Sequence, residues 1–163
     1  MRRRLLAVLT LTSAVVVVLV VAAVGQAAAG GVSVSGTYSA SDFGTTTCVP
    51  VGASAFMFRC DTAGFVSQYS GDLIGVAVAD FSSLINCQTG REIGHGTETF
   101  TGSMGGMTGA LSWTDVFSAD VDCTTFFPFN LDIKSVAVKG SGGFAGMQGK
   151  LTFTDTSYSG TLH

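Results

Sequence analysis

Basic side chains are scarce in this sequence, and after its first residues they are never clustered. Three of the eight lysines and arginines are Arg2, Arg3 and Arg4. The chain after residue 29 has five basic and eleven acidic residues, a formal charge of −6. Proteins that bind nucleic acid or an anionic lipid surface need a basic patch. We therefore expect no nucleic-acid partner, and no membrane partner once the N-terminal segment has been removed.

The sequence also lacks the motifs of several common catalytic and metal sites. It has no Gly-x-Ser-x-Gly motif, and His95 is the one histidine that is not terminal. It has no Cys-x-x-Cys or His-x-x-x-His pair, which are common zinc-site spacings. Asp115, Asp120 and Asp122 are not followed by the glycine and glutamate of a calcium-binding loop. We therefore expect no metal and no cofactor.

One long apolar run is present, and it lies at the N-terminus. Arg2–Arg4 precede the uncharged segment Leu5–Val24, and small residues follow at Ala27–Ala29. This order is typical of a secretory signal peptide. The run is also long enough to span a bilayer, so an uncleaved membrane anchor is the alternative. We predict a signal segment at 1–29 and one domain at 30–163, in a secreted or extracytoplasmic protein.

The four cysteines agree with export. Cys48, Cys60, Cys87 and Cys123 all lie after the apolar run, and their number is even. In an oxidising compartment this favours two disulfides, for which three pairings exist. We favour Cys48–Cys60 and Cys87–Cys123, because neighbouring antiparallel strands bring such residues together most easily.

Helical periodicity is absent after residue 29. Short segments that alternate apolar and polar residues recur instead, separated by glycine-containing turns, which predicts an all-β domain. The expected strands are Val32–Ser39, Ala53–Cys60, Gly64–Ser70, Leu73–Asp80, Glu92–Thr101, Gly109–Ala119, Leu131–Lys139 and Lys150–Leu162. The segments Ser33–Thr47 and Thr124–Pro128 are less regular. About eight strands of this length can close into an antiparallel barrel, and a β-sandwich is the alternative.

Residues 140–149 form a glycine-dense corner between two of these strands. The segment reads Gly140-Ser-Gly-Gly-Phe-Ala-Gly-Met-Gln-Gly149. Glycine permits positive φ angles and close backbone approach where a strand turns a corner. Phe144 and Met147 are expected to tuck under the corner and cap the core.

This corner carries a resemblance to a known family. Together with Leu151–Phe153 and Tyr158–Leu162, it resembles the closing segment of allene oxide cyclase-like and dirigent-like barrels. Gly96–Gly102 and Gly109–Trp113 are similar to the central hairpin of secreted bacterial members, many of unknown function. The resemblance covers residues 91–163 and implies a closed barrel of about eight antiparallel strands. The polar lumen residues of the plant cyclases have no counterpart placed on this chain, so their activity is not carried over.

The candidates for chemistry lie on the central strands. In a strand from Arg91 onward, His95 faces one way and Glu98 the other. Glu98, His95 and Asp115 are the candidate acids and bases, and Glu98 and Asp115 could form a carboxylate pair across neighbouring strands that shares one proton. The candidate ligand-binding aromatics are Trp113, Phe126, Phe127 and Phe129, although a core position is the simpler reading of Trp113.

These residues leave three functions open. Twelve phenylalanines with few candidate catalytic groups favour a non-catalytic module that binds a small apolar molecule or has a structural role. The family resemblance and the acidic candidates suggest a cyclase or isomerase that acts on a hydrophobic substrate in the barrel lumen. The third alternative is an interaction protein of the cell envelope that assembles as a homo-oligomer. We favour the first.

Overall fold

The structure is a computed structural model that describes residues 30–53 and 55–163, so the expected signal segment lies outside the described residues. The described elements are all β-strands, and every pair of neighbouring strands in the sheet is antiparallel. They are β1 (Val32–Asp42), β2 (Thr45–Pro50), β3 (Met57–Gly71), β4 (Ile74–Asn86), β5 (Arg91–Met104), β6 (Met107–Asp122), β7 (Phe127–Gly142), β8 (Gln148–Phe153) and β9 (Ser157–Leu162).

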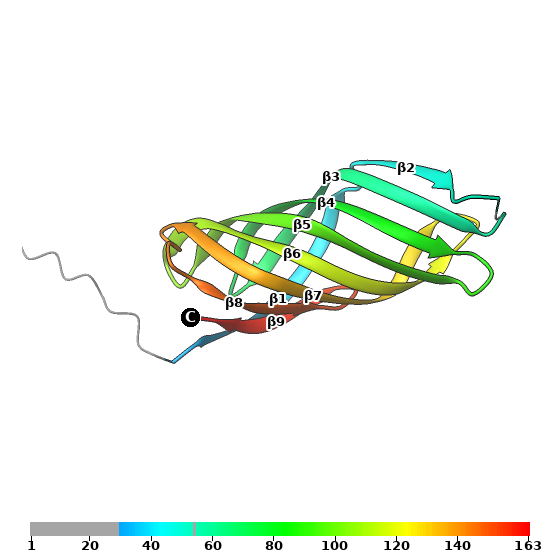
Figure 1. The fold of residues 1–163 in the computed structure, drawn as a ribbon. Coiled ribbons are helices and arrows are strands. Elements are labelled where there is room, and N and C mark those ends of the chain that lie inside the picture. The colour runs from blue at the N-terminus through cyan, green and yellow to red at the C-terminus, as the bar shows by residue number, and fades with distance from the viewer. Residues whose placement is uncertain (1–29, 54) are drawn as a thin grey trace, which may run out of the picture.

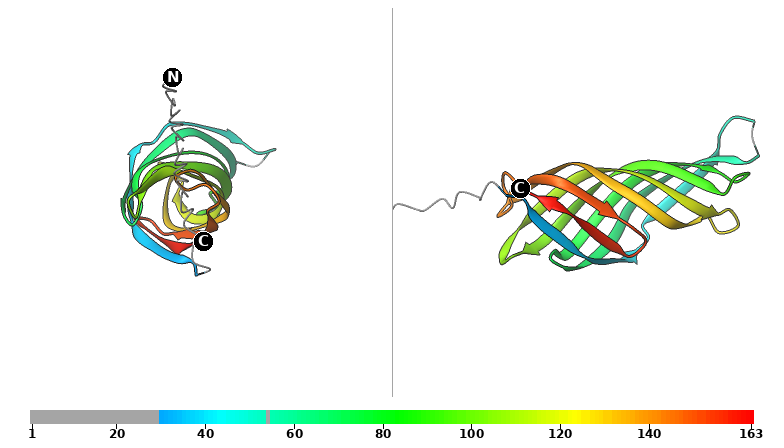
Figure 2. Two further views of the ribbon diagram at one scale, coloured as in Figure 1. Left: turned by 90° about the vertical axis from the view of Figure 1, so that its left-hand side faces the viewer. Right: turned by 90° about the horizontal axis from the view of Figure 1, so that it is seen from below.

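The nine strands form one sheet, and eight of them close into a ring (Figure 1). The ring closes because β1 has two partners: Val32–Thr37 pair with β9, and Gly36–Asp42 pair with β3. The chain then continues as β2, which pairs with the remaining length of β3. The view along the axis in Figure 2 shows the strands winding around a common centre.

The strand boundaries differ from the expected ones at three places. The expected strand Ala53–Cys60 begins only at Met57, and it forms with Gly64–Ser70 a single strand, β3, which continues through a bulge where Gly64 has a φ of 72°. The expected strand Lys150–Leu162 is two strands, β8 and β9, joined by a turn in which Thr154 N–H donates to the Ser157 carbonyl. Strand β2 lies in a segment that was expected to be irregular.

The missed strand β2 has a physical explanation. It is an edge strand whose residues are mostly exposed, so no alternation of apolar and polar residues marks it. Its last residue is Pro50, which lacks a backbone N–H and is tolerated at a sheet edge.

The main core fills the part of the ring near the glycine corner. Phe144 from that corner is completely buried there, and Met147 packs against the same cluster. Gly142 and Gly146 have φ angles of 64° and 87°, and a Cβ on Gly140 would lie 1.9 Å from the Phe144 carbonyl oxygen. The expectation that Phe144 caps the core beneath a glycine corner is confirmed.

A smaller cluster lies at the other end of the long strands. Cys60, Ile85 and Val121 are buried there among the cysteines of both disulfides. Cys48–Cys60 joins directly opposed residues of β2 and β3, and Cys87–Cys123 joins the β4–β5 turn to the end of β6. These are the two favoured pairings, and they indicate an oxidising, extracytoplasmic environment.

Within residues 30–53 and 55–163, no helix has the length and hydropathy of a membrane span.

We expect Phe144→Ala to lower the free energy of unfolding by about 3–5 kcal/mol, because it empties a fully buried aromatic site. Phe129→Ala is the matched control, since this ring is 46% exposed and should cost less than about 1 kcal/mol. Urea denaturation of both variants, with the disulfides intact, measures the difference. An equal loss of unfolding free energy in the two variants would contradict the assignment of Phe144 as the residue that caps the main core.

Candidate functional site

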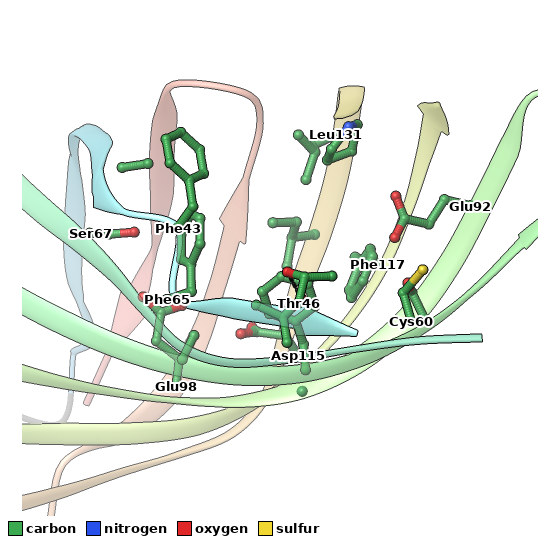
Figure 3. Close-up of a pocket in the computed structure, with 18 of the residues that line it drawn as sticks. Phe43, Thr46, Cys60, Phe65, Ser67, Glu92, Glu98, Asp115, Phe117 and Leu131 are labelled. Carbon is green, nitrogen blue, oxygen red and sulfur yellow. Dashed lines mark hydrogen bonds between the residues drawn. The ribbon is translucent and has the colours of Figure 1, made fainter. Parts of the chain in front are cut away.

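A cavity of about 480 Å³ occupies the interior of the sheet beyond the main core (Figure 3). On β5 the core residues begin at Phe100, whereas the cavity is lined by Glu92, Gly96, Thr97 and Glu98. On β6 the core includes Trp113, and the cavity is lined by Asp115 and Phe117. The cavity therefore starts where the packed core ends.

Phenylalanine rings form much of the cavity wall. Successive edge-to-face contacts join Phe43 to Phe65, Phe65 to Phe81 and Phe81 to Phe117, with ring centroids 5.8–6.0 Å apart. Phe43 also meets Phe127 at 6.3 Å, and these two rings are 60% and 56% exposed. The cavity thus reaches solvent beside Phe43 and Phe127.

The opening follows from the strand pairing. Among the described residues, β2 pairs with β3 alone, and β7 meets β8 only from Ile133 onward. Thr46 on β2 and Phe127–Pro128 on β7 both line the cavity, yet no ladder joins these two edges. The sheet therefore leaves the cavity accessible between β2 and the start of β7.

The inward row of β5 combines acids with glycines. Glu92, Gly94, Gly96 and Glu98 alternate with the more exposed residues of the strand. A Cβ on Gly94 would lie 2.3 Å from the Phe117 ring, and a Cβ on Gly96 would lie 2.6 Å from the Phe81 Cβ. These glycines make room for the aromatic wall between the two glutamates.

Glu98 and Asp115 are diagonal neighbours on the inner face of the sheet. Glu98 lies opposite Trp113, and Asp115 lies two residues further along β6, opposite Gly96. The hydroxyl of Tyr69 donates a hydrogen bond of 2.8 Å to Glu98 Oε1. Asp115 is 8% exposed, and its Oδ1 has no hydrogen-bond partner. The structure thus brings two of the three predicted acid-base candidates together.

Burial makes both carboxyls weak acids. It raises the pKa of Glu98 to about 7, although the hydrogen bond from Tyr69 favours ionisation. Burial, and then the negative charge of Glu98, raise the pKa of Asp115 to about 8. The indole Nε1 of Trp113 lies close enough to lower the pKa of both, yet no hydrogen bond of normal geometry joins it to either. Two such groups titrate as a unit and share a proton near neutral pH.

Two tyrosines beside this pair stay protonated. Burial and the charge of Glu98 raise the pKa of Tyr38 and of Tyr69. Their rings stack with centroids 5.7 Å apart, and the Tyr38 hydroxyl donates to the Thr154 carbonyl. The Glu98–Asp115 pair therefore lies next to aromatic rings and accepts a hydrogen bond from a phenol hydroxyl.

Glu92 is a further buried acid in the same cavity. It is 5% exposed, its Oε2 has no hydrogen-bond partner, and burial raises its pKa. Figure 3 shows Glu92 near Cys60 and Phe117 on one side of the view, and Glu98 on the other side. Tyr69 and Glu92 were not among the sequence candidates, although the spacing Glu92-x-Gly94-x-Gly96-x-Glu98 places both acids on one strand face.

The remaining sequence candidates lie in different surroundings. His95 is exposed on the outer face of β5, away from Glu98 and Asp115. Trp113 is a core residue that stacks on Phe153, with centroids 6.0 Å apart. Phe126 and Phe127 line the cavity, and Phe129 does not.

Among the described residues, no group of three or more histidine, cysteine, aspartate or glutamate side chains could hold a metal ion. No family model matches the chain, and no curated protein matches its sequence.

The raised pKa values predict a distinctive pH dependence of stability. Between about pH 4 and pH 8 the folded protein binds more protons at Glu98 and Asp115 than the unfolded chain does, so the free energy of unfolding falls as pH rises. We expect a fall on the order of 2 kcal/mol between pH 5 and pH 8 in urea denaturation. Glu98→Gln should reduce this fall, with Asp115 and Glu92 contributing the remainder, because burial raises the pKa of both.

Asp132→Asn is the control, because it removes one charge at an exposed side chain on β7. It should leave the pH dependence unchanged. Stability that rises from pH 5 to pH 8, or an equal fall in wild type and Glu98→Gln, would contradict the buried-pair assignment.

Proposed function

We propose that this protein binds a small, largely apolar molecule in the cavity lined by residues of β1 to β8. The observation that carries this proposal is a phenylalanine-lined space of about 480 Å³ that reaches solvent. Protein interiors normally pack without voids of this size, and ligand sites are typically concave, apolar and furnished with a few polar groups.

The scaffold around the cavity suits a preformed site. Its walls are long antiparallel strands joined by backbone ladders, and both disulfides lie at the end where no strand among the described residues closes the ring. A rigid wall lowers the entropy lost on binding. This supports binding without a large rearrangement of the protein.

We further propose that the eight-stranded ring is a closed barrel of the allene oxide cyclase-like or dirigent-like kind, exported after removal of residues 1–29. The buried Phe144 beneath the glycine corner and the two disulfides support this description. Homo-oligomeric assembly at the cell envelope stays a prediction.

A second candidate function is catalysis, favoured by one specific observation. Glu98 and Asp115, with pKa values of about 7 and about 8, meet at the inner end of an apolar cavity. Carboxyls with pKa values near the working pH are suited to proton transfer. An isomerase or cyclase acting on the bound molecule would use this pair as acid and base.

Filling the cavity tests the binding proposal. Ala79 lines the cavity and lies opposite Glu98, so Ala79→Phe should occupy the space beside the pair. We expect it to weaken binding of 1-decanol by at least about tenfold in isothermal titration calorimetry. Val78→Phe, at the adjacent exposed position, is the matched control and should bind like wild type. Equal affinities in all three proteins would overturn the assigned cavity.

Native mass spectrometry of protein purified from its own host separates binding from catalysis. Binding predicts a co-purified small molecule whose mass is unchanged after incubation with fresh protein. Catalysis predicts conversion by wild type that Glu98→Gln loses while it still binds. Release of the molecule unaltered by wild type would reject the catalytic candidate.

A further inference from the structure

The charged residues that line the cavity limit the class of ligand that it can bind. We propose that the ligand is a hydrophobic amine whose ammonium group binds the Glu98–Asp115 pair and whose apolar body lies against the phenylalanine wall. This inference rests on the binding function proposed above and adds the chemistry of the ligand's polar end.

The charges of the lining all have one sign. Among the described residues that line the cavity, five are acidic and none is lysine, arginine or histidine; the acids are Asp80, Glu92, Glu98, Asp115 and Asp155. An apolar wall strengthens the field of these acids, because charges interact more strongly where water is displaced. A carboxylate ligand would be repelled, and a neutral ligand would gain no charge–charge attraction from the acids.

The pair also has unused hydrogen-bond capacity. Asp115 is 92% buried and lines the cavity, and its Oδ1 accepts no hydrogen bond. Even when the Trp113 indole and the proton shared by the two carboxyls are counted with the Tyr69 hydroxyl, three donors face the four oxygens of Glu98 and Asp115, which can each accept more than one hydrogen bond. A buried acceptor without a donor is costly, and an ammonium group brings three donors.

Aromatic rings lie next to the Glu98–Asp115 pair. The Tyr69 hydroxyl binds Glu98, its ring stacks with Tyr38, and Phe153 meets both rings edge-on with centroids 5.7 Å and 6.4 Å away. A cation near aromatic faces is attracted by their quadrupoles. Carboxylates and aromatic surface at one end, with a phenylalanine wall beyond, match a molecule that is cationic at one end and apolar along its body.

Binding of an ammonium group must compete with the proton that the pair shares. The titratable groups that face Glu98 and Asp115 are Tyr38 on β1 and Tyr69 on β3, while β4 and β7 contribute an alanine and a serine. Asp155 in the β8–β9 turn lies beyond them, beside Tyr38. The phenols stay protonated, so the pair itself is the group that changes charge. An alkylammonium stays protonated to above about pH 10. Amine affinity should therefore rise from pH 6 to pH 8.5, with release of a proton.

Three ligands with the same alkyl chain test the inference in calorimetry at pH 8: decylamine, 1-decanol and decanoate. We expect decylamine to bind at least about tenfold more tightly than decanol, and decanoate to bind most weakly. Asp115→Asn and Glu98→Gln should each reduce the amine-to-alcohol ratio to within about threefold while decanol affinity is retained. Asp132→Asn, which removes an exposed charge, should keep the wild-type ratio.

The outcomes separate this inference from the binding proposal. Absence of both decanol and decylamine binding in wild type would overturn the binding function itself. Decanol binding with no preference for decylamine, or the same loss of preference in Asp132→Asn, would overturn the amine inference alone. Loss of the preference in Glu92→Gln, with Asp115→Asn unaffected, would overturn the assignment of the ammonium site to the pair.

Discussion

The two-sided pairing of β1 is the interaction on which the rest of the structure depends. One part of β1 pairs with β9 and a later part pairs with β3, which turns an open sheet into a ring. Because β1 ends at Asp42, this closure covers only part of the length of β3. Inside the closed part the side chains pack into a continuous core around Phe144. Beyond it the same strands enclose a cavity with an accessible side.

The two disulfides lie where ring closure ends. Cys48–Cys60 fixes the edge strand β2 to β3, and Cys87–Cys123 fixes the β4–β5 turn to the end of β6. Without them the long strands at this end would depend on a small apolar cluster and on a sheet with two open edges. Cross-links restrict the unfolded chain and stabilise such regions. They keep the cavity wall in place where hydrogen bonding alone is incomplete.

The buried acids lower the stability of the folded protein when they ionise. Glu98 and Asp115 lie at the boundary between the core and the cavity, and Glu92 lies farther from the core, on the side of the disulfides. Burial without a basic partner disfavours their ionised forms, so each lowers stability as the pH rises. Proteins retain such groups chiefly at functional sites. Their common orientation toward an apolar space connects the stability of this protein to its proposed ligand.

Sequence alternation was sufficient for the all-β class and the faces of β5, because side-chain direction repeats every two residues in a strand. The role of Phe144 followed instead from its place between the glycines of the corner. The alternation placed Glu98 and Asp115 on neighbouring strands, and the even count of cysteines with their spacing indicated both disulfides. Strand β2 and the continuity of β3 could not be read in this way. An exposed edge strand has no alternation, and a bulge at Gly64 resembles a turn in sequence.

The sequence by itself determined the local features, strand periodicity and the glycine corner, because these depend on residues near one another along the chain. It favoured the observed cystine pairs without fixing them, since four cysteines allow three pairings and Cys87 and Cys123 are 36 residues apart. Only the tertiary structure decided where the core stops and the cavity begins, and which acids face it. Those properties depend on the length over which β1 closes the ring and on the register of five strands at once. No short segment of the chain contains that information.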